Sequence, residues 1–190
     1  MNGEESVLED PARVQTIEAF ADTIVPGERR GPDDRAVAGA AAGPGAVAAG
    51  ALELLRWPAG GLSDSLDGLA DILTMHAEEY AARRGVELDP AVPAFVALGF
   101  EDRTALVLEL TAPEHPEKQL WVGLALFSNM AFDSAAHLAT ADAFAQGHPG
   151  LRHLGYTPPG ADGLWRFPQY SYRRPLAPLH PGTTSTGSPA

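Results

Sequence analysis

The sequence predicts an all-α protein, with a single helical bundle domain in residues 11–146 and an extended C-terminal arm, rich in proline and aromatic residues, in residues 147–190. Two observations favour this fold. Apolar residues in the first part recur at helical spacing, and no segment there alternates polar and apolar residues as a half-buried strand does. The chain of 190 residues, 45% of them hydrophobic, suits one domain with its own core.

The first expected helix runs from Pro11 to about Ile24, because Asp10 is a good N-cap and proline suits the first helical position. Two Ala-rich helical pieces are expected next, in residues 35–42 and 46–57, and the Gly-Pro-Gly sequence between them breaks any single helix. Their small side chains permit close approach by other helices or by a partner subunit. Neither of the glycine-rich nucleotide-loop patterns, GxxxxGKS/T or GxGxxG, occurs here, so a nucleotide site is not indicated.

Three further helices are expected along the chain. Residues 64–84 place apolar residues on one side of a helix, and Gly85 provides its stop. A proline-containing loop then leads to a short helix in residues 101–111. The last and most apolar helix is expected in residues 117–146, and it ends at Gly147.

Composition excludes several classes of function. The net charge of −12 argues against nucleic acid and against an anionic membrane surface as partners, because both would repel the chain. Cysteine is absent, which excludes thiolate catalysis and cysteine-bound metal clusters. No segment is apolar enough to predict a membrane span, and the acidic N-terminus lacks the pattern of an export signal, so a cytoplasmic location is expected.

The best functional clue is a set of three polar residues in the most apolar stretch: Asn129, Asp133 and His137. In one helix this four-residue spacing places them on one face. A carboxylate and an imidazole among apolar residues cost free energy unless they are paired or reach water or a ligand. Two interpretations stay open. The set is either a buried hydrogen-bond network, or a site in which Asp133 orients His137 for proton transfer while Asn129 positions a polar substrate group.

Other histidines are weaker candidates. His76, on the apolar side of the 64–84 helix, is either a satisfied core residue or a fourth member of the same site. The paired Glu-x-x-His motifs of a di-iron bundle are missing, so no metal site is predicted. The remaining histidines lie in loops or beside proline and are expected to be solvated turn residues: His115, His148, His153 and His180.

The arm carries four aromatic side chains close to arginines: Trp165, Phe167, Tyr170 and Tyr172. A merely disordered tail would be polar and poor in aromatic residues. These four are therefore candidates for substrate binding, as a lid over an apolar ligand, or for anchoring a protein partner.

Residues 18–27, with the sequence EAFADTIVPG, precede a charged loop and the Ala-rich pieces. This order resembles the opening of the small third subunit of gluconate 2-dehydrogenase. The likeness is clear over residues 14–57 and extends more weakly to about residue 145. With residues 127–137 and 163–168 included, the chain is more similar to an actinobacterial family of uncharacterised proteins related to that subunit.

The resemblance implies an accessory subunit that partners a large flavin-dependent oxidoreductase of the glucose–methanol–choline type. That partner would carry the FAD and the catalytic histidine, and this chain would hold no cofactor. The alternative is a stand-alone, cofactor-independent enzyme of secondary metabolism that acts on an apolar, polycyclic natural product. In that enzyme Asp133 and His137 would transfer protons. A non-catalytic ligand-binding or homo-oligomeric scaffold is the third hypothesis.

Overall fold

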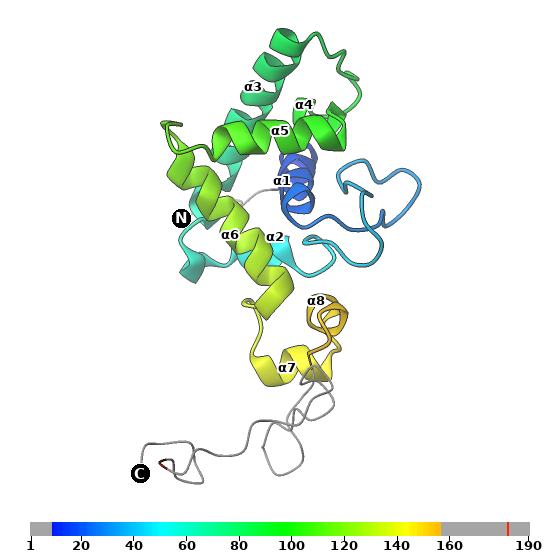
Figure 1. Ribbon diagram of the computed structural model, residues 1–190, viewed down its shortest axis with the longest axis vertical. Helices are drawn as coiled ribbons and strands as arrows, with labels where there is room; N and C mark the ends of the chain where they lie inside the picture. Colours follow the sequence, from blue (N-terminus) through cyan, green and yellow to red (C-terminus); the bar gives the residue numbers. More distant parts are fainter. Residues whose placement is uncertain (1–8, 157–181, 183–190) are drawn as a thin grey trace, which may run out of the picture. The chain divides into compact units, whose positions relative to one another are not determined.

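The computed structural model describes residues 9–156 and residue 182. Within residues 9–156 the chain forms eight α-helices and two short 3-10 helices but no strand, which confirms the all-α prediction (Figure 1). These helices belong to one unit that ends at Tyr156. The four aromatic candidates of the arm lie outside the described residues. None of the described helices is long and apolar enough to cross a membrane.

The helices vary greatly in length, and the three longest, of 14, 19 and 17 residues, form most of the bundle. The bounds are α1 (Pro11–Ile24), α2 (Ala51–Arg56), η1 (Pro58–Gly60), η2 (Ser63–Ser65), α3 (Leu66–Arg84), α4 (Ala94–Ala97), α5 (Phe100–Leu110), α6 (Lys118–Ser134), α7 (Thr140–Ala145) and α8 (Pro149–His153). Helix α1 begins as its sequence predicts. Asp10 accepts the backbone N–H of Ala12 at 2.9 Å, and Pro11 occupies the first turn.

The hydrophobic core lies around α1, which contacts α2 through α6 (Figure 1). At its centre the Phe20 ring packs against Phe95 and Trp121, with ring centroids 6.3 Å and 6.1 Å apart. All three side chains are fully buried. Burial of each large side chain stabilises the fold by about 1.5–3 kcal/mol, so this aromatic centre joins α1 to α4 and α6.

The Gly/Ala segment, residues 35–50, is irregular. The helix predicted in residues 35–42 is therefore wrong, and the one predicted in residues 46–57 begins only at Ala51, as α2. Two carbonyl groups at the start of the segment, those of Arg35 and Ala36, accept hydrogen bonds from the buried side chain of Arg103. Arg103 is 4% exposed, and its guanidinium donates five hydrogen bonds of 2.6–3.0 Å to backbone carbonyls. The accepting carbonyls belong to Arg35, Ala36, Phe95, Val96 and Leu98.

A second buried charge, Asp22 at the end of α1, holds the other side of the Gly/Ala segment. Its Oδ1 accepts the backbone N–H of Val47 at 3.1 Å. Two glycines allow this approach, because a Cβ on Gly45 would collide with the Asp22 carboxylate and one on Gly27 would collide with the Gly45 backbone. Asp22 and Arg103 thus satisfy backbone groups that an irregular segment would otherwise bury without partners.

The long helix predicted in residues 117–146 is also interrupted. Helix α6 ends at Ser134, and Ala135 takes a left-handed conformation with φ of 50°. A contact distant in sequence lies at this helix end: Gly150, in α8, packs so closely on the Phe132 carbonyl that a Cβ would collide with it. Helix α8 itself lies beyond residue 146, where the sequence analysis placed the extended arm.

Candidate functional site

The three polar candidates do not share one helix face. Asn129 and Asp133 lie on α6, and Asn129 Nδ2 donates to Asp133 Oδ2 at 2.8 Å. His137 lies beyond the end of α6, in the turn that leads to α7. The expected alignment of His137 with the other two is therefore wrong, because the backbone turns at Ala135.

His137 instead packs against the turn that precedes α2. Its ring lies against Gly50, where a Cβ would collide with it, and 5.7 Å from the His148 ring centroid. The His137 Nδ1 atom is buried and makes no hydrogen bond among the described residues. Burial, assisted by His148, holds the pKa of His137 below its usual range, so the ring is poorly suited to carry a proton here.

His148 is buried, so its prediction as a solvated turn residue is wrong. Its Nε2 lies 2.9 Å from the Ala49 carbonyl, and its Nδ1 accepts the backbone N–H of Leu151 at 3.3 Å. This pattern assigns the proton to Nε2. His137 and His148 together attach the α7–α8 hairpin to the turn before α2, which is a structural role.

Helix α6 presents an outward row of five side chains, which we call the α6 seam. Its members follow alternating three- and four-residue steps, the spacing of a coiled-coil contact row. Val122 is 38% exposed and Leu126 is 53% exposed, whereas Trp121, Leu124 and Ser128 on the opposite side are fully buried. The α6 seam comprises Gln119, Val122, Leu126, Asn129 and Asp133.

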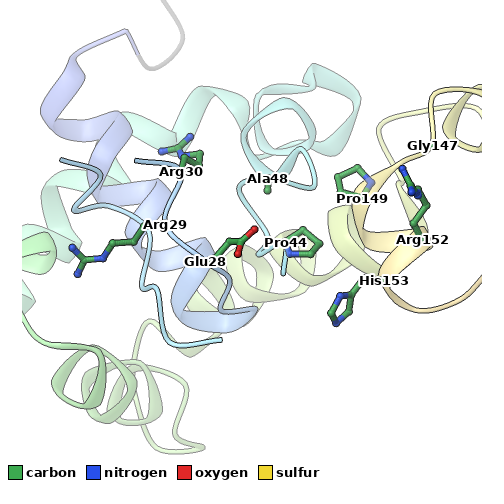
Figure 2. Close-up of a pocket in the computed structure, with 9 residues that line it drawn as sticks. All are labelled: Glu28, Arg29, Arg30, Pro44, Ala48, Gly147, Pro149, Arg152 and His153. Carbon is green, nitrogen blue, oxygen red and sulfur yellow. The ribbon is translucent and has the colours of Figure 1, made fainter. Parts of the chain in front are cut away.

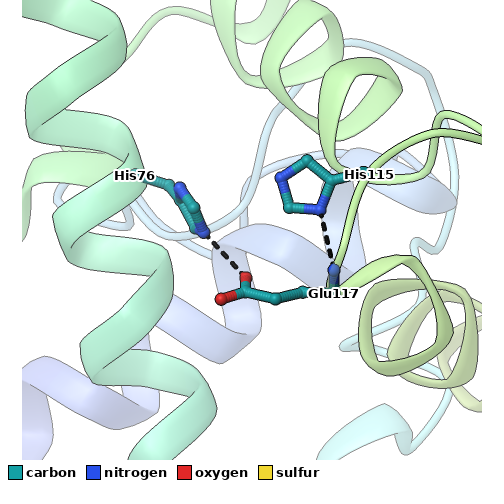
Figure 3. A group of neighbouring side chains, drawn as sticks. All are labelled: His76, His115 and Glu117. Atoms are coloured by element: carbon teal, nitrogen blue, oxygen red, sulfur yellow. Dashed lines mark hydrogen bonds and ion pairs between the residues drawn. The ribbon is translucent and has the colours of Figure 1, made fainter.

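His76 belongs to a different cluster, together with His115 and Glu117 (Figure 3). His76 Nε2 lies 2.9 Å from Glu117 Oε2, and the same oxygen accepts the Trp121 indole N–H at 3.1 Å. The hydrogen bond to His76 holds the pKa of the Glu117 carboxyl below its usual range. His115 Nδ1 accepts the backbone N–H of Glu117 at 3.2 Å.

Sequence reasoning missed this cluster because its members are separated along the chain. His76 lies on α3, and Glu117 is 41 residues further on, at the N-terminal end of α6. The only local signal was the sequence His115-Pro116-Glu117, which places two ligand-type side chains at the start of an expected helix. His115 is half-buried beside His76 and is not the solvated residue that we expected.

A pocket of about 580 Å³ opens where residues 28–48 meet residues 147–153, which include α8 (Figure 2). Its charges do not converge: Figure 2 shows Arg29 and Arg152 on opposite sides of the pocket. Arg30 is already paired with Glu18 at 3.0 Å and with Asp34 at 2.7 Å. The predicted catalytic residues do not line this pocket, whose walls are Glu28, Arg29, Arg30, Pro44, Ala48, Gly147, Pro149, Arg152 and His153.

Comparison with known proteins identifies the family of this chain. No curated protein and no solved structure matches it. One family model, described as a family of unknown function (DUF5987), matches residues 11–190. This match covers nearly the whole sequence, and the chain therefore belongs to the DUF5987 family.

Proposed function

We propose that this protein is an accessory subunit that docks through the α6 seam onto a helix of a larger flavin-dependent oxidoreductase. The observation that carries the proposal is the outward row on α6, in which two exposed apolar side chains are followed by a hydrogen-bonded polar pair. Coiled-coil spacing is what a second helix requires for continuous side-chain contact.

The apolar and the polar residues of the α6 seam would have different roles in docking. Burial of Val122 and Leu126 against a partner would contribute about 1.5–3 kcal/mol for each side chain. Asn129 and Asp133, joined at 2.8 Å, are half-buried and hold each other in place. A polar residue in such a row fixes the register of a partner helix at some cost in affinity. The polar residues in α6 are thus explained as determinants of specificity.

The identity of the partner rests on the resemblance of residues 18–27 to the small gluconate 2-dehydrogenase subunit. In this chain Asp22 and Gly27 of that motif hold the Gly/Ala segment, which is a structural task. A motif with a structural task is compatible with an accessory subunit, in which the catalytic residues belong to the partner. On this proposal the glucose–methanol–choline-type partner binds the FAD, and this chain binds none.

The stand-alone enzyme is less well supported, because its proton-transfer pair is not assembled. Asp133 bonds to Asn129, whereas His137 faces Gly50 and His148. A substitution separates the two roles. If His137 is a structural residue, His137→Ala lowers the melting temperature and any activity falls only with the folded fraction. Activity lost at an unchanged melting temperature would favour the enzyme.

Co-expression with a large flavin-dependent oxidoreductase, chosen from among the genes beside its own, tests the docking proposal. The expected product is one yellow complex on gel filtration, whereas this chain alone is colourless. Leu126→Glu places a charge in the α6 seam and should release the chain from the complex. Leu108→Glu, at an apolar α5 residue that is 66% exposed, is the matched control and should leave the complex intact.

Two outcomes would overturn the proposal. A complex that survives Leu126→Glu would show that the α6 seam is not the contact. Alternatively, the chain could form a dimer by itself that Leu126→Glu dissociates, with no affinity for the flavoprotein. The α6 seam would then join two copies of this chain, as in the homo-oligomer hypothesis.

A further inference from the structure

We propose that His76, His115 and Glu117 form a binding site for a divalent transition-metal ion of the zinc class. One potential ligand atom from each residue lies within 4.8 Å of the others. Figure 3 shows the imidazole of His76 aimed at the Glu117 carboxylate, with His115 beside them. Two imidazoles and one carboxylate are a donor set that zinc uses in proteins. This site is independent of the docking role proposed for the α6 seam.

The atoms are nearly at the spacing that a bound ion requires. Zinc holds nitrogen and oxygen ligands at about 2.0–2.2 Å, which places neighbouring ligands about 3.3 Å apart in a tetrahedron. The 2.9 Å separation of His76 Nε2 and Glu117 Oε2 is close to that edge. The other pairs of ligand atoms lie at most 4.8 Å apart, so the two atoms of each pair would need to move closer by about 1.5 Å at most.

Two of the three ligands are held by rigid parts of the fold. His76 lies within the 19-residue helix α3, and its ring packs edge-on against the fully buried Trp121 at 5.9 Å. The Trp121 indole N–H orients the Glu117 carboxylate by a 3.1 Å hydrogen bond. Such a hydrogen bond to a ligating carboxylate is the outer support typical of metal sites.

His115 supplies the adjustable ligand. It lies in the turn before α6, and its Nδ1 lone pair accepts the Glu117 N–H in a long bond of 3.2 Å. Coordination through Nδ1 replaces that bond. Coordination through Nε2, which faces His76 in Figure 3, instead requires the proton to move to Nδ1. Either route breaks one weak hydrogen bond. The three bonds to the metal ion stabilise the site by more than this loss.

The bound ion would have two consequences. It would join α3 to the turn before α6 and so stabilise the bundle at that point. Three protein ligands also leave a fourth tetrahedral position, which water or a side chain of a partner could occupy. All three residues are half-buried, so solvent reaches the edge of the cluster.

Titration of ZnCl₂ into chelator-treated, full-length protein tests the site. The expected result is saturable binding of one Zn²⁺ per chain, with a rise of about 5 °C or more in melting temperature when free zinc exceeds Kd by about a hundredfold. Co²⁺ in place of Zn²⁺ should give the intense visible bands of a four-coordinate site.

Two variants and one control make the test specific. His115→Ala and Glu117→Gln should each weaken binding at least about tenfold, since even loss of an outer hydrogen bond costs that much at metal sites. His115 lies in a turn, and glutamine can keep the hydrogen bond from Trp121, so both variants should fold, as far-UV circular dichroism would verify. His153→Ala, at an exposed histidine outside the cluster, should bind zinc normally. Absence of saturable binding, or normal affinity in either variant, overturns the proposal.

Discussion

Two buried charged side chains hold the Gly/Ala segment in its irregular path. Burial, together with the nearby Arg29 and Arg35, lowers the pKa of Arg103 to about 10, so the side chain still carries its charge at neutral pH. Five backbone carbonyl groups accept hydrogen bonds from its guanidinium and compensate for the burial of its charge. Burial raises the pKa of Asp22, and nearby backbone N–H groups oppose that rise. Each charge therefore depends on the backbone around it.

Arg103→Lys tests this dependence. A lysine ammonium has three donors and no planar fork, so several of the five carbonyls would be left buried without partners. We expect the free energy of unfolding to fall by at least about 3 kcal/mol, measured by urea denaturation. Arg13→Lys, on the surface beside Asp71, is the control and should change stability little. Equal effects at the two sites would contradict the role assigned to Arg103.

His137 should make stability depend on pH. Its pKa in the folded chain is lowered from 6.5, so the unfolded chain binds the proton more readily. The stabilising contribution is therefore complete above about pH 6.5 and is lost as pH falls below that value. We expect His137→Gln to show a smaller loss of stability between about pH 7.5 and about pH 5.5 than the wild type, by chemical denaturation. An identical loss in the two proteins would show that His137 is not the group responsible.

The sequence shows which polar residues lie among apolar ones, but not which residues surround them in the folded chain. Asp133 and His137 stand out as polar residues among apolar ones, yet their partners depend on where α6 ends. The sequence predicts a solvated turn residue at His115 and does not single out Glu117, because their relation to His76 exists only in the folded chain. Side chains whose function needs a distant partner cannot be assigned from local pattern.

At the scale of elements, local signals predicted the helices that have clear ends. Asp10 and Pro11 begin α1, and Gly85 ends α3 with φ of 69°. The failures occur where a distant contact overrides a favourable local sequence. Alanine favours a helix, but the Ala-rich segment begins with the Arg35 and Ala36 carbonyls bonded to the distant side chain of Arg103. Similarly, the apolar pattern continues past Ala135, but α6 ends where α8 packs closely on the Phe132 carbonyl.

Substitutions at two glycines should change the stability of the fold in opposite directions. Gly27→Ala would drive a Cβ into the Gly45 backbone, which cannot move without disturbing the Asp22 contact. We expect a loss of about 2 kcal/mol in the free energy of unfolding. Gly68→Ala, in α3 with nothing within 4 Å of the added Cβ, should instead stabilise by about 0.5–1 kcal/mol. Thermal denaturation of both variants measures the contrast, and changes of the same sign would contradict it.

At the scale of the molecule, α6 joins the core to the surface that we assign to docking. Its inner side holds Trp121 and Leu124 against the bundle, and its outer side carries the α6 seam. The rigid core thus presents Val122 and Leu126 in a fixed geometry, which reduces the entropy lost on binding. The metal site proposed at the N-terminal end of α6 would hold that end of the helix against α3.

Binding of the α6 seam to a helix of a flavin-dependent oxidoreductase underlies the function that we propose. Its most direct test is the dissociation constant between purified flavoprotein and three forms of this chain: wild type, Leu126→Glu and Leu108→Glu. We predict at least about tenfold weaker binding for Leu126→Glu, since loss of one buried leucine exceeds 1.4 kcal/mol, and wild-type affinity for Leu108→Glu. Equal affinities for the wild type and Leu126→Glu would contradict the claim.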